Sequence, residues 1–127
     1  MITTAQELRA LLERLFPAFR AELIGSYHTD GNGYFTPHGL CMEFSYFFSH
    51  NLTSLLPSEM AELFLIIETI VASDPEDRNP VANALCTCFL ENIACTDEGE
   101  ISRQFMGVVS RAYFDGWHAS HDSGNRS

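Results

Sequence analysis

The chain has 127 residues, and its 17 Asp and Glu residues outnumber seven basic residues, all Arg, for a formal net charge of −10. A surface this acidic repels nucleic acid and anionic membranes and attracts basic protein surfaces. The 46% apolar content excludes a disordered chain. The length is that of one domain, and we predict a single helical domain over residues 1–119. The polar residues 120–127 are expected to form a flexible C-terminal tail.

The first residues lack the basic and apolar regions of a secretory signal. The longest apolar stretches, such as Leu63–Ile67, are far too short to cross a bilayer. We therefore expect a cytoplasmic protein with no membrane association.

The first predicted helix covers residues 5–23. Thr4 and Glu7 form a capping box at its start, and Pro17 is expected to kink or interrupt it. The next segment, residues 25–35, is predicted to be a loop because its centre is the turn-forming sequence Asp-Gly-Asn-Gly. A short β-hairpin is the alternative for this segment.

The second predicted helix, residues 37–49, is apolar on nearly every side. Thr36 is a good N-cap, and Pro37 suits the first helical position. A helix of this composition is either buried or placed at an interface. Its Phe residues therefore make it a candidate seam for a homodimer.

Three further helices are predicted, over residues 57–72, over residues 80–94, and from Asp97 to near Trp117. The five helices favour an all-α fold, a compact bundle of about five helices. A pair of HEAT-like hairpins is the runner-up, since the third and fourth helices look like one repeat unit. The fifth helix carries an apolar stripe of Ile101, Phe105, Val108, Val109, Ala112 and Tyr113.

Polar and metal-binding residue types gather in the first half of the chain. Their spacing matches no zinc signature, and an apolar helix raises the pKa of a thiol such as Cys41. We therefore predict no catalytic residue, no metal site, no cofactor and no enzymatic activity. The cluster is His28, Asp30, His38, Cys41, Glu43 and His50.

Two other groups have similar chemistry. His118 and His121, with Asp122 next to them, could share a helix face and hold a metal ion, but a flexible C-terminus is the preferred interpretation. The four Cys residues are expected to be reduced and to pack as small hydrophobic side chains.

Two acidic turns, near residues 74–77 and 97–100, are better candidates for function. In an up-and-down bundle the first turn shares an end with the 25–35 loop, which places aromatic side chains beside carboxylates. Such a mixture suits a binding hot spot for a basic protein. The alternative is that the acidic residues only cap helices and solvate turns. The predicted partner-binding residues are Tyr27, His28, Asp30, Tyr34, Phe35, Asp74, Glu76 and Asp77.

The segments Leu63–Glu68, Ala72–Asp74, Val81–Leu85 and Phe89–Ile93 resemble small, acidic, helical bacterial proteins. The function of that group is undefined, but the genes of its members often lie beside polymorphic toxin genes, in the manner of immunity proteins. The resemblance implies that this chain binds a cognate basic toxin domain and occludes its active site. A homodimeric scaffold and a protein that binds a small ligand or a metal remain the alternatives.

Overall fold

The computed structural model describes residues 2–24, 26, 34–74 and 78–125, with side chains described as far as Gly116. Every regular element in these ranges is helical and none is a strand, which confirms the all-α prediction. The elements are α1 (Ala5–Leu15), α2 (Phe19–Leu23), α3 (Pro37–Asn51), the 3-10 turn η1 (Leu52–Ser54), α4 (Pro57–Ala72), α5 (Pro80–Leu85), the π-helical segment η2 (Cys86–Leu90), α6 (Glu91–Ile93), α7 (Asp97–Arg103) and α8 (Val108–Asn125).

The helix starts follow the capping signals. The Thr36 hydroxyl accepts a hydrogen bond from the Gly39 amide at 3.0 Å, and the Asn79 side chain accepts one from the Val81 amide at 3.0 Å. These bonds satisfy amides that would otherwise lack a partner in the first helical turn. The predicted starts of α3 and α5 are therefore confirmed. The predicted bounds of α3 and α4 also agree with the structure to within two residues.

Two predicted helices are each divided. The first breaks around Pro17 into α1 and α2, as predicted. The fifth was predicted as one helix but forms α7 and α8, which are separated by residues 104–107. With α5, η2 and α6 counted as one rod, the described residues contain seven helices where about five were predicted.

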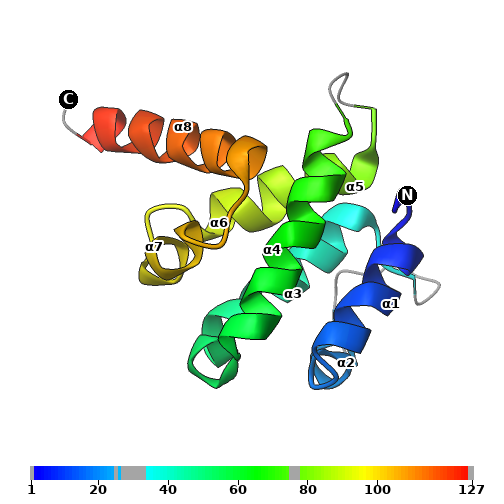
Figure 1. Cartoon of the computed structure of the whole chain (residues 1–127). Helices are drawn as coiled ribbons and strands as arrows, with labels where there is room; N and C mark the ends of the chain where they lie inside the picture. Colours follow the sequence, from blue (N-terminus) through cyan, green and yellow to red (C-terminus); the bar gives the residue numbers. More distant parts are fainter. Residues whose placement is uncertain (1, 25, 27–33, 75–77, 126–127) are drawn as a thin grey trace.

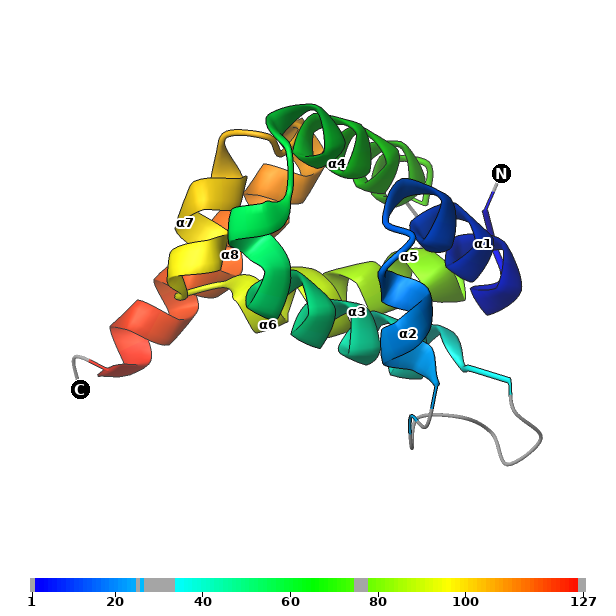
Figure 2. The same cartoon turned by 90° about the horizontal axis from the view of Figure 1, so that it is seen from below.

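Phenylalanine rings connect the helices through the centre of the molecule. Phe44 of α3 packs on Phe19 at a centroid distance of 5.2 Å and on Phe89 at 5.3 Å. Phe48 meets Phe89 edge-to-face at 5.2 Å and Phe64 of α4 at 6.2 Å. Figures 1 and 2 show the resulting arrangement, with α3 beside the α5–α6 rod, α4 across from them, and α1–α2 and α7–α8 on opposite flanks.

The burial of α3 removes the reason for expecting a dimer seam at residues 37–49. Phe44, Phe47 and Phe48 are each at most 3% exposed, because helices of the same chain cover them. The apolar faces of α3, which the sequence predicted to be covered, are therefore covered by other helices of the same chain.

The final helix is longer than predicted. Helix α8 runs to Asn125, where the sequence suggested an end near Trp117. In both views its C-terminal part extends beyond the other helices (Figures 1 and 2). Within the described ranges, none of the helices has the length and apolar character required to cross a membrane.

Candidate protein-binding surface

Five of the predicted partner-binding residues lie outside the described ranges, and of the other three only Tyr34 is largely exposed. Tyr34 is 58% exposed, whereas Phe35 is only 8% exposed. The Arg9 guanidinium of α1 lies 5.6 Å from the centre of the Phe35 ring and covers it. Phe35 therefore contributes to the core and offers no apolar anchor to a partner. The five residues outside the described ranges are Tyr27, His28, Asp30, Glu76 and Asp77.

Asp74 has a structural task at the turn between α4 and α5. Its carboxylate accepts hydrogen bonds from the backbone amides of Arg78, at 2.8 Å, and Asn79, at 3.1 Å. This carboxylate therefore shapes the approach to α5. The structure places Asp74 beside a hollow next to α8, whereas Phe35 lies against α1.

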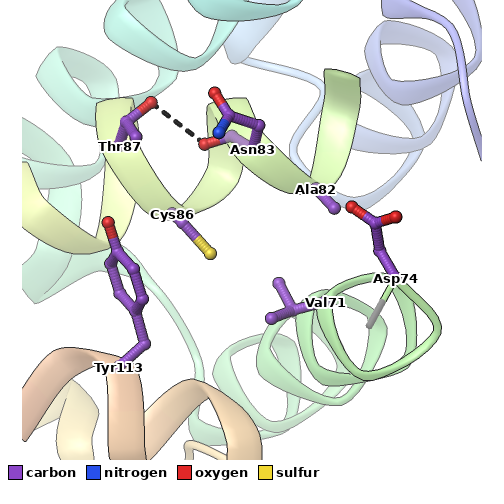
Figure 3. Close-up of a pocket in the computed structure, with 7 residues that line it drawn as sticks. All are labelled: Val71, Asp74, Ala82, Asn83, Cys86, Thr87 and Tyr113. Atoms are coloured by element: carbon purple, nitrogen blue, oxygen red, sulfur yellow. Dashed lines mark hydrogen bonds between the residues drawn. The ribbon is translucent and has the colours of Figure 1, made fainter. Parts of the chain in front are cut away.

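The hollow beside Asp74 lies between α4, α5–η2 and α8 (Figure 3). Its volume is about 350 Å³, and the Cys86 thiol points into it. The Tyr113 hydroxyl, at the α8 side, donates a hydrogen bond to Glu91 at 2.5 Å. A hollow with a thiol, a carboxylate and a phenol could hold a small polar molecule. It is lined by Val71, Asp74, Ala82, Asn83, Cys86, Thr87 and Tyr113.

The sequence offered little sign of this hollow, because it depends on the π-helical turn at η2. The Glu91 amide reaches back five residues to the Cys86 carbonyl, which widens the turn. Such widened turns are frequent at functional sites, yet a periodicity of 3.6 residues does not reveal them.

The residues of the predicted His and Cys cluster that the structure describes do not come together at one site. His38 Nε2 pairs with the Asn83 side-chain oxygen at 2.8 Å, while Glu43 accepts a bond from the Ser26 hydroxyl at 2.6 Å. His50 lies twelve residues after His38, about 18 Å along an α-helix. No group of three or more His, Cys, Asp or Glu side chains in the described ranges could hold a metal ion.

The four Cys residues form no disulfide, and all of them lie in the described ranges. Burial is the main reason that the pKa of the Cys41 thiol is raised well above its usual range, and the nearby Cys88 and Cys86 raise it further. A thiol held protonated in this way is a poor nucleophile.

A second surface feature lies where α4 meets the turn between α7 and α8. Glu68 of α4 accepts hydrogen bonds from the Val109 amide at 3.0 Å and from the Ser110 amide and hydroxyl, both at 2.8 Å. Burial alone would raise the pKa of this carboxyl, but the three bonds outweigh it and lower the pKa below its ordinary value. Glu68 thus acts as an N-cap for α8 from another helix.

The approach of Glu68 to α8 requires a glycine. A Cβ atom placed on Gly107 would lie 2.4 Å from both Cγ and Cδ of Glu68. On the other side of the same turn, one Arg111 amino group donates to the carbonyls of Arg103 and Met106 at 3.2 and 3.3 Å. The turn between α7 and α8 is therefore held from both sides by polar contacts.

A groove of about 380 Å³ opens at this turn, and we refer to it as the corner groove. Leu65 on its α4 side is 67% exposed, and Val108 beside it is 84% exposed. In the sequence Val108 belongs to an apolar stripe, and that pattern does not indicate a groove. The one local signal was the glycine within that stripe. The groove is lined by Ala61, Phe64, Leu65, Glu68, Gln104, Phe105, Met106 and Gly107.

Negative charge is concentrated in the second half of the chain. Residues 61–127 hold eleven of the 17 acidic residues and four of the seven Arg. In the first half of the chain, two of the three Arg residues form ion pairs with one carboxylate of α1. Arg9 and Arg20 contact Glu13 at 3.1 and 3.9 Å. The first turn of α7 carries Asp97, Glu98 and Glu100 together.

Comparisons with protein-family models, curated proteins and solved structures find no match to this chain.

Proposed function

We propose that this protein is an immunity protein, which binds the basic domain of a cognate bacterial toxin and neutralises it by covering the active site. The observation that carries the proposal is a formal net charge of −10 with the acidic excess concentrated in residues 61–127. A basic surface approaching this part of the chain is attracted over a distance and oriented before contact.

The ion pairs support this reading because they leave acidic groups for a partner. Arg103 engages Asp115 through two hydrogen bonds of 2.9 and 2.7 Å, and this contact raises the pKa of Arg103. Within the described residues, Asp97, Glu98 and Glu100 form no ion pair as close as this one. Carboxylates presented together can replace the phosphates of an anionic substrate in a basic active site.

The test is a binding and inhibition measurement with the purified product of a neighbouring toxin-like gene. We expect a stoichiometric complex in which the toxin loses activity, and an association rate that falls by about tenfold or more between low and high salt. An association rate independent of salt, or a complex in which the toxin keeps its full activity, would contradict the proposal.

A second candidate function, small-ligand binding, is favoured by the hollow at Cys86. Its volume of about 350 Å³ lies at the lower end of the range for ligand pockets. Native mass spectrometry and metal analysis of untagged protein test this alternative. A small molecule bound in stoichiometric amount to the wild-type protein, and absent from a Tyr113→Ala variant, would favour small-ligand binding over the immunity function.

A further inference from the structure

The apolar side chains around the corner groove are exposed in a way that the sequence pattern does not predict. Ile101, Val108 and Val109 belong to one apolar stripe, yet they are 49%, 84% and 41% exposed. The break at residues 104–107 directs α7 and α8 differently, so a single core face cannot cover the stripe. Single exposed apolar residues are common, but a group of them beside a groove marks an interaction surface.

The groove has acidic side chains on both sides. On α7, Glu100 is exposed and lies four residues before Gln104, which lines the groove, so both share a helix face. On α4, the carboxylate-bearing side chain of Glu68 lines the groove itself. An apolar floor between two acidic sides is complementary to a helix with an apolar stripe and basic flanks.

The same charges disfavour a second copy of this chain. Two copies meeting at this groove would place like-charged carboxylates opposite each other in a protein that already carries −10. A basic segment gains from the carboxylates that a second copy would find repulsive.

Polar contacts also hold the walls of the groove together before it meets a partner. Glu68 ties α4 to the start of α8, and Arg111 ties the start of α8 to the end of α7. A surface held by such contacts loses little conformational entropy on binding, so more of the contact energy appears as affinity.

We infer that the corner groove is the docking site for a basic amphipathic helix of the protein partner. The apolar stripe of that helix packs on Leu65, Phe105 and Val108, and its Lys or Arg residues face Glu68 and Glu100. The inference rests on the proposed function, for which it supplies the contact surface. It places that surface at the α4, α7 and α8 corner and not around Tyr34 and Asp74.

The test uses a synthetic helical peptide of leucine and lysine, with Leu at positions i, i+3, i+4 and i+7. A peptide of the same composition in scrambled order measures charge attraction alone. We expect the Leu65→Ser/Val108→Ser double variant to weaken binding of the ordered peptide by about tenfold or more, through lost apolar contact. Ile24→Ser is the matched control, because Ile24 is 80% exposed on another part of the surface, and it should change affinity less than about twofold.

A second pair of variants tests the acidic sides. Glu100→Gln should weaken the affinity for the peptide by about two- to fivefold at low salt. Glu22 is an exposed residue of α2, and Glu22→Gln should leave this affinity unchanged. Hydrogen exchange should show peptide-induced protection at residues 61–68 and 104–109. Protection elsewhere, equal binding of the scrambled peptide, or equal losses in the control variants would overturn the inference.

The remaining outcomes separate this inference from the proposed function. If a cognate toxin is bound with unchanged affinity by the Leu65→Ser/Val108→Ser variant, the groove is not its docking site although the immunity function stands. If the peptide docks in the groove and a toxin proves insensitive to the protein, the groove stands and the immunity function fails. A protein dimer that the double variant dissociates would assign the groove to a second copy and overturn the inference.

Discussion

The aromatic centre around α3 and the corner where α7 meets α8 are built in different ways. At the centre, rings from distant helices pack on one another, and Phe44, Phe48 and Phe89 are at most 1% exposed. At the corner, a carboxylate and a guanidinium hold two helices in place, and apolar side chains remain exposed beside them.

This difference separates the part that stabilises the fold from the part available for binding. Burial of Phe rings provides a large, non-directional stabilisation. The polar contacts at the corner contribute less energy but set the direction of two helices. An interaction surface can be built where apolar groups are not needed for the core, which is the case at the corner.

The largest expected effect is at the aromatic centre. Phe44→Ala removes a ring that contacts Phe16, Phe19, Phe47, Phe48 and Phe89, and it should cost about 3–5 kcal/mol of unfolding free energy. Denaturant unfolding measures this loss. Tyr46→Ala on the same helix is the control, because Tyr46 is 57% exposed. This variant should change the unfolding free energy by no more than about 0.5 kcal/mol. Similar losses in both variants would remove the distinction between core and surface faces of α3.

The next effect is at the corner. Gly107→Ala introduces a Cβ within 2.4 Å of the Glu68 side chain, so Glu68 must move away from α8. Loss of this cap should cost about 1–2 kcal/mol, measured by thermal or denaturant unfolding. Gly116→Ala, within α8, is the matched control, since its Cβ would meet nothing within 4 Å. That control should be neutral or stabilising by up to about 1 kcal/mol. A neutral Gly107→Ala would show that the Glu68 contact does not hold the corner.

The carboxyl of Glu68 should make the corner sensitive to acid. The pKa of Glu68 is lowered in the folded protein. The ionised carboxylate therefore stabilises the fold fully above the ordinary pKa of Glu, about 4.3, and this stabilisation is lost as pH falls through the lowered pKa. Glu68→Gln should cost about 1 kcal/mol near pH 7 and a smaller amount at low pH, where the wild-type carboxyl is itself protonated. Unfolding measured from pH 7 to pH 3 tests this. A constant difference across that range would assign the effect to something other than the charge.

The smallest effect concerns the connection between the two regions. Cys95, between α6 and α7, adopts a φ of 65°, in the left-handed region that favours glycine. Cys95→Gly should therefore raise the unfolding free energy by about 0.5–1 kcal/mol, because glycine adopts this backbone conformation without the steric cost of a Cβ atom. Cys95→Ala is the control, since alanine shares the steric cost, and it should bring no gain. A loss of stability in the Gly variant would show that the backbone conformation is not the dominant cost at this position.

Much of the fold was predictable because its signals are local. Thr36 with Pro37, and Asn79 with Pro80, define helix starts through hydrogen bonds and backbone geometry within a few residues. Pro17 likewise divides the first helix through its own ring. The Phe-rich composition of residues 37–49 predicted a buried or interface helix, and only the tertiary structure decided that the cover comes from the same chain.

The candidate site was less predictable because its contacts join distant parts of the sequence. Glu68 caps α8 through bonds to residues 41 and 42 positions later, and an isolated segment contains no trace of such a partner. The apolar stripe of residues 101–113 looked continuous, and only Gly107 indicated a break. The acidic residues of α7 were visible from the start, but their place beside an apolar groove was not.

By itself, the sequence determined the helical class, most helix starts and the acidic character, since each depends on composition or on neighbours within one or two turns. The tertiary structure alone decided that Phe35 is buried, that η2 widens around Cys86, and that Leu65 and Val108 remain exposed beside a groove. Those outcomes depend on how whole helices pack, and packing is a competition among contacts that no local pattern contains.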